Sequence, residues 1–275
     1  HTQFCDGRAE AEDFVIAAIK NKLSILGFSS HSPVPFDSVW NMKIEDLPLY
    51  INTIGQLKNK YASEIDILLS METDYIPGVF GADNKIFSEN KFDYLIGSIH
   101  YLDYLNDGTP WAIDGPNEWF DRGYNEVFKG DAKTYAQRFT DVSCEMMQKG
   151  GFDIVGHIDK MHQHGNRYFS VNEPWYRKLV GELLSTARDK QLIVEINTKS
   201  YVKHGFFYPH QSFFKLLKEL GVWVTINSDT HDPERITLAY NEATEALITA
   251  GINEVMEFRN GQWESCKLTK KGVVL

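Results

Sequence analysis

Short apolar segments of strand length alternate with segments of helical period along most of this chain. Apolar strands that are separated by helices are typical of a mostly parallel sheet that is covered on both faces. With 275 residues and 43% hydrophobic residues, the chain is large enough to form this fold as one domain over residues 1–275. The predicted strands are residues 23–28, 65–71, 94–99, 152–156, 192–196 and 222–227, and the predicted helices are residues 10–22, 47–62, 131–149, 174–190 and 210–220.

Residues 101–130 interrupt this alternation. They are rich in Gly, Asp, Asn and aromatic residues, and they show no clear period. Long segments of this kind in compact domains often serve a function, so we predict a loop or lid insertion here. Its aromatic residues Trp111, Trp119, Phe120 and Tyr124 are expected to pack the lid, and stacking on a substrate ring is the alternative.

The balance of charge and the number of cysteines restrict the class of protein. The formal net charge is −10, from 28 basic and 38 acidic residues, which disfavours nucleic-acid binding. Three cysteines without metal-finger spacing favour a reducing cytoplasm over a disulfide framework. We see neither a signal peptide nor an apolar run of membrane-spanning length, so we expect a cytoplasmic protein without membrane or nucleic-acid partners.

Residues that can bind metal lie just past the carboxyl ends of the predicted strands. Each one taken alone is more commonly a loop or capping residue. Their shared placement at one strand end predicts a common site at the C-terminal mouth of a barrel. Mixed imidazole and carboxylate ligands suit zinc, iron or manganese, and metal ions would neutralise the buried charges. These residues are His31, Glu72, His100, His157, Asp229 and His231.

Six motifs in order, "HTQFCDG", "GFSSH", "METDYIPG", "GSIH", "GHID" and "NSDTHDPE", resemble those of the polymerase and histidinol phosphatase (PHP) superfamily, and most of all its histidinol-phosphatase members. The resemblance extends from residue 1 to about residue 240. It implies an α/β fold, a distorted seven-stranded TIM-like barrel, with three divalent metal ions (Zn, Fe or Mn). In that site Glu72 would bridge two ions. The implied ligands are His1, Asp6, His31, Glu72, His100, His157, Asp229 and His231.

The same resemblance implies a reaction. It is the hydrolysis of L-histidinol phosphate to L-histidinol and inorganic phosphate, a step of histidine biosynthesis. A metal-activated hydroxide would attack phosphorus, and the departing alkoxide would need a general acid. Asp229 and His231 are the candidates for that acid, beside Glu72 as the bridging catalytic carboxylate.

A phosphate monoester also needs cationic partners from the protein. The resemblance points to Lys160 and Lys199, and Arg167 lies just beyond Lys160 in the sequence. An imidazole and an amine would want carboxylate or amide partners, for which Glu195 and Asn197 are the candidates. A solvated charge is the ordinary alternative for any lysine or arginine on a loop.

Two alternative functions stay open. The first is a PHP phosphoesterase that acts on a nucleotide, a nucleic-acid end or phosphotyrosine, and the acidic charge disfavours its nucleic-acid version. The second is a non-catalytic PHP domain that binds metal for structure or supports a partner. Loss of ligand residues would mark that second case, and the motif positions after His1 are all filled by competent ligands.

His1 differs from the other candidate ligands because no predicted strand precedes it. Since the others follow strands, we expect His1 to follow one as well. The expected strand would lie upstream of His1, and it would end in a histidine two positions before it.

Overall fold

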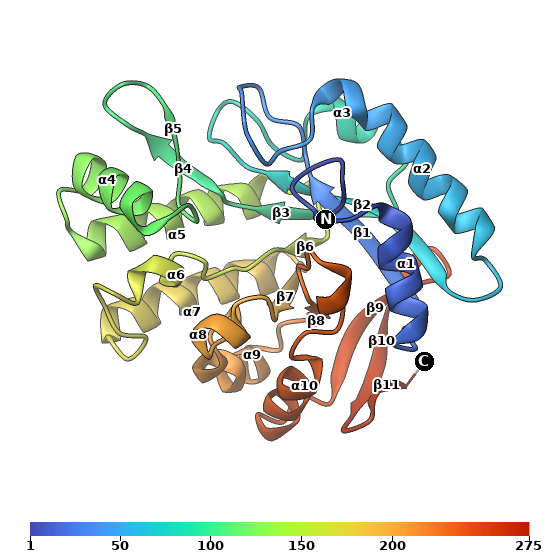
Figure 1. The fold of residues 1–275 in the computed structure, drawn as a ribbon. Helices are drawn as coiled ribbons and strands as arrows, with labels where there is room; N and C mark the ends of the chain where they lie inside the picture. Colours follow the sequence, from blue (N-terminus) through green and yellow to red (C-terminus); the bar gives the residue numbers. More distant parts are fainter. Residues whose placement is uncertain (275) are drawn as a thin grey trace.

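A curled parallel sheet forms the centre of the molecule (Figure 1). A computed structural model describes residues 1–274. All six predicted strands are present, and they pair in parallel in the order β1-β2-β3-β6-β7-β8. Their bounds are Ile25–His31 (β1), Asp66–Asp74 (β2), Tyr94–Ser98 (β3), Ile154–Val155 (β6), Ile193–Asn197 (β7) and Val224–Asn227 (β8).

Helices cover the outer side of the sheet, as the helical periods predicted. In α2 the buried residues Tyr50, Ile54 and Leu57 share one face, and this helix contacts β2. None of the helices within residues 1–274 is both long and apolar enough to cross a membrane. The helices are α1 (Ala11–Lys20), α2 (Leu47–Lys60), α5 (Ala132–Lys149), α7 (Pro174–Asp189), α9 (Phe214–Leu220) and α10 (Tyr240–Thr249), with short turns α3 (Lys85–Ser88), α6 (His162–Gly165), α8 (Tyr201–His204), η1 (Ile44–Asp46), η2 (Gln211–Phe213) and η3 (Pro233–Arg235).

Two strands extend further than the apolar pattern predicted. β1 continues to His31, and β2 continues through Glu72 to Asp74. These strands pair in parallel with His31 directly beside Glu72. The apolar runs stop earlier because the last residues of both strands carry polar side chains into the site. Hydrophobicity alone therefore underestimated the length of these strands.

The sheet is open between its two outer strands. β1 pairs only with β2, and β8 pairs only with β7. A cavity of about 480 Å³ is lined by residues of both open edges and by His1 and Glu72. The TIM-like α/β architecture is therefore confirmed, although residues 1–274 supply six parallel strands where seven were expected.

Residues 101–130 are not the structureless loop that was predicted. They form a hairpin of β4 (Tyr101–Tyr104) and β5 (Pro110–Ala112), followed by helix α4 (Asn117–Phe128). Trp111 is fully buried and contacts the ring of Phe120, and a side chain at Gly123 would overlap the indole of Trp111. The predicted aromatic packing is confirmed. The sequence pattern did not reveal these elements because the two strands are very short and α4 is polar over most of its surface.

A second sheet packs against the barrel near the carboxyl terminus (Figure 1). It is antiparallel, and the sequence pattern had not assigned it. Met256, Phe258 and Trp263 pack against barrel residues such as Tyr94 and Ile154. The strands are β9 (Glu254–Arg259), β10 (Gln262–Thr269) and β11 (Gly272–Val274).

Glu257 of β9 is expected to make stability depend on pH. Burial raises the pKa of its carboxyl from 4.5 to about 7, although Arg259 opposes the shift. Because the folded-state pKa is the higher one, this group's stabilising contribution is full below about pH 4.5 and is lost as pH rises through 7. Glu257→Gln should therefore unfold at higher urea concentration than wild type at pH 8, by about 1 kcal/mol in unfolding free energy, and should match it at pH 4.5.

The exposed Glu254 on the same strand offers a matched control, since Glu254→Gln should change stability little at either pH. An equal gain for Glu257→Gln at both pH values would contradict the assignment.

Candidate metal centre

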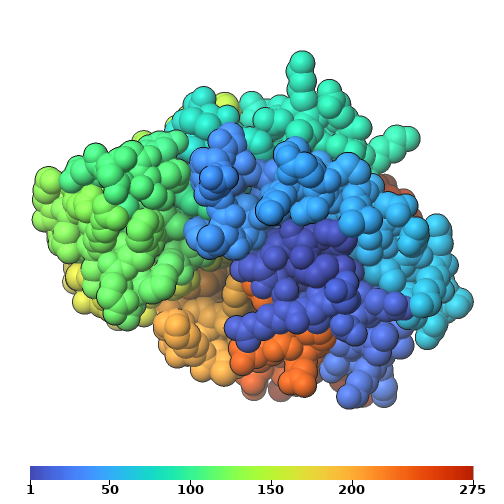
Figure 2. Space-filling model, turned by 45° about the horizontal axis from the view of Figure 1, so that its top comes forward, coloured from blue at the N-terminus to red at the C-terminus, as the bar shows by residue number. Residues whose placement is uncertain are grey.

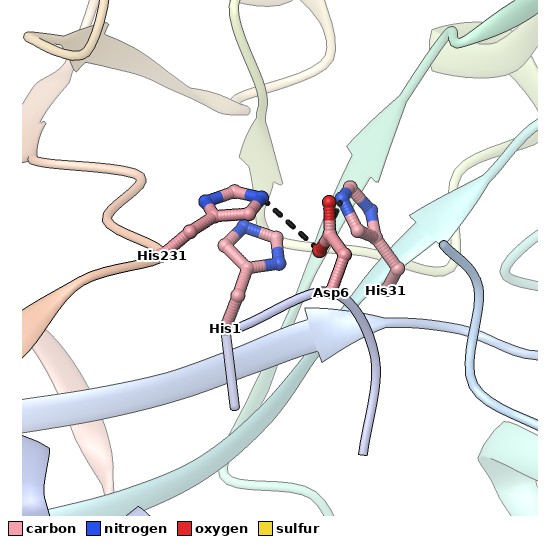
Figure 3. A group of neighbouring side chains, drawn as sticks. All are labelled: His1, Asp6, His31 and His231. Carbon is pink, nitrogen blue, oxygen red and sulfur yellow. Dashed lines mark ion pairs between the residues drawn. The ribbon is translucent and has the colours of Figure 1, made fainter. Parts of the chain in front are cut away.

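Four ligand-type side chains gather where the amino-terminal segment meets the ends of β1 and β8. Figure 3 shows His1, Asp6, His31 and His231 turned toward one another. Asp6 Oδ1 lies 3.1 Å from His231 Nε2 and 3.8 Å from His31 Nε2. The rings of His1 and His231 stack at 3.9 Å. The donor atoms of all four residues lie within 4.8 Å of one another, which is the spacing that a bound metal ion requires.

A second group of ligand-type side chains, Glu72, His100 and His157, is buried at the ends of β2, β3 and β6. Glu72 Oε1 lies 2.9 Å from His157 Nε2 and 3.5 Å from His100 Nε2. The two histidine Nε2 atoms face each other at 3.1 Å. Two imidazole nitrogens pointing at one carboxylate oxygen are arranged as ligands around a common point.

Glu72 lies between the two groups. Its Oε1 faces His100 and His157, and it accepts a hydrogen bond of 2.7 Å from Ser98 Oγ. Its Oε2 lies 3.2 Å from His31 Nδ1 and 3.6 Å from His1 Nε2. The two oxygens of one carboxylate therefore face different groups, the geometry needed for the bridging role that the sequence predicted.

Asp229 joins the first group from the end of β8. Its Oδ1 accepts a hydrogen bond of 3.0 Å from His1 Nε2. The backbone holds these segments together, because the His1 amino group donates to Thr230 O at 3.2 Å and Arg8 N donates to His231 O at 2.8 Å. Figure 2 shows the amino-terminal residues, in dark blue, packed against the orange segment near β8.

The carboxylates of the site are held in their charged form. Burial alone would raise the pKa of Glu72, but the charge of His100 and the hydrogen bond from His157 hold it well below its usual range. Burial acts in the same way on Asp229, but the charge of Lys199, together with the hydrogen bond and charge of His1, holds the pKa of Asp229 well below normal. Both groups are anionic at neutral pH, as metal ligands must be.

The imidazoles divide into two kinds. Burial lowers the pKa of His157 to about 4 and that of His31 well below 6.5, so both are neutral at pH 7 and offer a lone pair. His1 behaves in the opposite way: burial opposes its charge, but the hydrogen bond to Asp229 raises its pKa to about 10. The buried carboxylates thus stabilise a positive charge on His1.

These residues fit divalent metal ions. Anionic carboxylates and neutral imidazoles are present together, and their buried negative charge needs nearby cations. A mixed nitrogen and oxygen donor set suits zinc, iron or manganese better than calcium, which prefers oxygen ligands alone. All eight ligands predicted from the sequence are brought to this one region: His1, Asp6, His31, Glu72, His100, His157, Asp229 and His231.

Two of the three predicted phosphate contacts lie beside the ligands. Lys199 Nζ is 3.1 Å from Asp229 Oδ1 and 3.3 Å from His231 Nε2. Lys160 is 5% exposed, and its Nζ forms an ion pair of 3.1 Å with Asp114. Burial alone would lower the pKa of Lys160, but the charges of Asp114, Asp229 and Glu72 together raise it. Lys160 is therefore a cation at neutral pH.

Arg167 is placed differently from the prediction. Its guanidinium donates to both carboxylate oxygens of Asp121 on α4. It therefore ties α4 to the segment after α6. Sequence proximity to Lys160 had suggested a shared role, but Lys160 pairs with Asp114 and Arg167 with Asp121.

Glu195 and Asn197 also differ from their predicted role as substrate contacts. Both lie at the end of β7, they are 4% and 0% exposed, and they hydrogen-bond to each other at 3.0 Å. Burial, followed by the nearby charge of Asp229, raises the pKa of Glu195 to about 7. Their polar atoms hydrogen-bond to the His157 backbone, to Asp229 and to Asn227.

Sequence reasoning missed Asp74, which is fully buried beside the second group. His100 Nδ1 donates to Asp74 Oδ1 at 2.8 Å, and Asn41 Nδ2 donates to Asp74 Oδ2 at 2.8 Å. This arrangement directs His100 Nε2 toward Glu72 and fixes the ring. A signal was available, because Asp74 follows Glu72 by two residues on one strand, so both side chains point to the same face.

Removing the Asp74 carboxylate should weaken metal binding. Asp74→Ala leaves the His100 ring without its orienting partner, so the affinity for zinc is expected to fall by about 10- to 100-fold. Asp74→Asn keeps one acceptor oxygen and should lose less. Chelator competition measures both, with Asp66→Ala at the exposed start of the same strand as the control. Equal zinc affinity in Asp74→Ala and wild type would refute this role.

Comparison with known proteins agrees with this geometry. Residues 1–199 match the PHP domain family. A probable histidinol-phosphatase of Deinococcus radiodurans is 28% identical over 91% of this chain and 92% of its own length. The histidinol-phosphatase of Lactococcus lactis is 24% identical over 94% of this chain and 92% of its own length.

A solved structure shares the fold. Histidinol phosphate phosphatase from Lactococcus lactis, in complex with zinc, L-histidinol and phosphate, superposes with a TM-score of 0.73 at 21% identity, and the match covers 96% of each chain. The family match spans every candidate ligand from His1 to His157. The chain therefore belongs to the PHP domain family.

Proposed function

We propose that this protein is a metal-dependent phosphatase that hydrolyses L-histidinol phosphate to L-histidinol and inorganic phosphate. The observation that carries the proposal is the convergence of two ligand groups on Glu72, next to the cations Lys160 and Lys199. Anionic ligands for metals and cationic contacts for phosphate are both needed for hydrolysis of a phosphate monoester. The relatives that are named histidinol-phosphatases support this choice of substrate.

We assign three divalent ions to the site, with zinc, iron or manganese as the candidate metals. The zinc in the Lactococcus lactis structure supports zinc among them. Ions bound here would supply an activated water and draw charge from the phosphoryl oxygens. The residues of this chain would hold them: Glu72 between two ions, with His1, Asp6, His31, His100, His157, Asp229 and His231 around them.

Lys160 and Lys199 would hold the phosphate. Lys160 is buried, so its ammonium acts where water screens charge weakly. Lys199 is more exposed, at 44% of its side chain, and it lies against Asp229 and His231. It is therefore placed to receive phosphate at the rim of the site. Both contacts strengthen as negative charge gathers on the phosphoryl oxygens.

The departing alkoxide needs a proton. His231 and Asp229 remain the candidate general acids. The His231 side chain is 15% exposed and the Asp229 side chain 9%, so His231 exchanges protons with solvent more readily. Its Nε2 faces Asp6 at 3.1 Å, a contact that favours the protonated ring, although burial and the charge of His1 lower the pKa of His231 overall. These positions favour His231.

The strand expected upstream of His1 stays a prediction. The cavity between the open edges of β1 and β8 is where a seventh parallel strand would pair with both neighbours. His1 lies at the ligand end of this cavity.

We also place the enzyme in the cytoplasm, which is supported by the unpaired state of Cys5, Cys144 and Cys266.

A substrate panel tests the proposed function. The protein, expressed with its native amino terminus and loaded with zinc, iron or manganese, is assayed for phosphate release from L-histidinol phosphate and from generic monoesters. We expect the highest kcat/KM with L-histidinol phosphate. Equal rates with a generic monoester, a nucleotide and phosphotyrosine would contradict the substrate, and no release from any of them would favour a non-catalytic metal-binding domain.

A further inference from the structure

β7 lies between two strands that carry ligands at their ends, yet it carries none of the proposed ligands itself. His157 follows its neighbour β6, and Asp229 follows its neighbour β8. The carboxyl end of β7 holds Glu195 and Asn197, which are two residues apart and so share one face of the sheet. The end of β7 is therefore placed to act on both neighbouring ligands.

Hydrogen bonds connect these four residues in one continuous row. Glu195 Oε2 accepts from the backbone N–H of His157 at 2.9 Å and from Asn197 Nδ2 at 3.0 Å. Asn197 Nδ2 also donates to Asp229 Oδ2 at 3.0 Å. The row leaves the ligand-facing atoms, His157 Nε2 and Asp229 Oδ1, directed at Glu72 and His1.

Both ligand residues at the ends of this row have strained backbone. His157 has φ of 24° and Asp229 has φ of 47°, in the left-handed region that residues other than glycine rarely adopt. Such conformations persist only where surrounding contacts enforce them. A hydrogen bond at the His157 backbone, and another at the Asp229 side chain, are contacts of this kind.

The same polar atoms already have hydrogen-bond partners within the protein. Both amide hydrogens of Asn197 are donated, to Glu195 and Asp229, and its Oδ1 accepts from Lys199 N at 3.1 Å. Glu195 Oε1 accepts from Asn227 Nδ2 at 3.0 Å. Both side chains are almost completely buried.

We propose that Glu195 and Asn197 are positioning residues that hold His157 and Asp229 in place for metal binding. This proposal rests on the proposed metal-dependent function. In this proposal β7, which carries no ligand, sets the distance between the ligands that follow β6 and β8.

Zinc affinity, measured by chelator competition in the absence of substrate, tests the proposal. Asn197→Ala and Glu195→Ala are each expected to weaken zinc binding by about 10- to 100-fold. Glu195→Gln keeps an oxygen for the His157 N–H and Asn197, and Asn227 can turn its amide to meet the new NH2 group, so this variant should bind zinc nearly as wild type does. Thr198→Val is the matched control, because Thr198 is fully buried at the end of the same strand and its hydroxyl donates to Leu238 O, not to a ligand.

Unchanged zinc affinity in Asn197→Ala, together with a raised KM for L-histidinol phosphate, would overturn the proposal and restore a substrate contact. Asn197→Ser removes less of the side chain and serves as a second variant in case Asn197→Ala misfolds. Circular dichroism reports whether each variant is folded. If neither Asn197 variant folds even with zinc, the pair serves the fold and not the ligands, and the proposal is wrong. Wild-type protein that binds zinc but does not hydrolyse L-histidinol phosphate would instead refute the proposed function and leave this role intact.

Discussion

Glu72→Gln is expected to lower the turnover of L-histidinol phosphate by on the order of a thousandfold and to reduce the number of bound metal ions. The change removes the carboxylate whose two oxygens face different ligand groups. Its two oxygens lie 2.9 Å from His157 Nε2 and 3.2 Å from His31 Nδ1, and an amide offers one weaker oxygen in their place. Turnover is measured as phosphate release at saturating substrate, and metal content by elemental analysis.

Glu242→Gln supplies the control, because Glu242 is exposed on α10. The variant should keep wild-type turnover and metal content. Glu72→Gln with normal activity and a full complement of metal would refute the site itself, since the two oxygens of Glu72 face the two ligand groups.

Lys160→Met is expected to lower kcat/KM for the phosphate monoester by about 10- to 100-fold, the equivalent of the roughly 1.5–3 kcal/mol that one hydrogen bond to a charged group contributes. The substitution keeps the length of the side chain and removes the buried cation. It also leaves the Asp114 carboxylate without its partner, so the melting temperature should fall. Steady-state kinetics and thermal unfolding measure the two effects.

The double variant Lys160→Met with Asp114→Asn separates these effects. Removing both charges should restore much of the lost stability, while the phosphate contact stays lost. Lys203→Met, at an exposed position of α8, is the control and should behave as wild type. Recovery of kcat/KM in the double variant would contradict a phosphate contact and would leave Lys160 with a structural role only.

The convergence of the ligand residues that follow the strands could be predicted because one physical rule connects them. Parallel strands end at the same edge of a sheet, so residues that follow different strands meet in space. His100 and His157, 57 residues apart, therefore face each other at 3.1 Å. That rule needs only the position of each strand, which the apolar runs supplied.

Predictions about side-chain partners succeeded less well. Arg167 is close to Lys160 in sequence, but its partner is Asp121 of α4. Nothing in the sequence linked those two, because α4 lies in the segment that was read as a loop. Glu195 and Asn197 have the right chemistry for a substrate, yet their neighbours on β6 and β8 occupy their hydrogen bonds. Which partner a polar side chain chooses depends on packing across strands, and hydrophobic periodicity carries no information about it.

Metal removal and restoration test the central claim most directly. The protein, with its native amino terminus, is stripped by chelation and then titrated with zinc, iron or manganese, while phosphate release from L-histidinol phosphate and bound metal are measured on the same samples. We predict that release disappears on chelation and returns in proportion to the metal bound. Release at an unchanged rate from protein shown to be metal-free would contradict the claim that this ligand cluster performs the reaction.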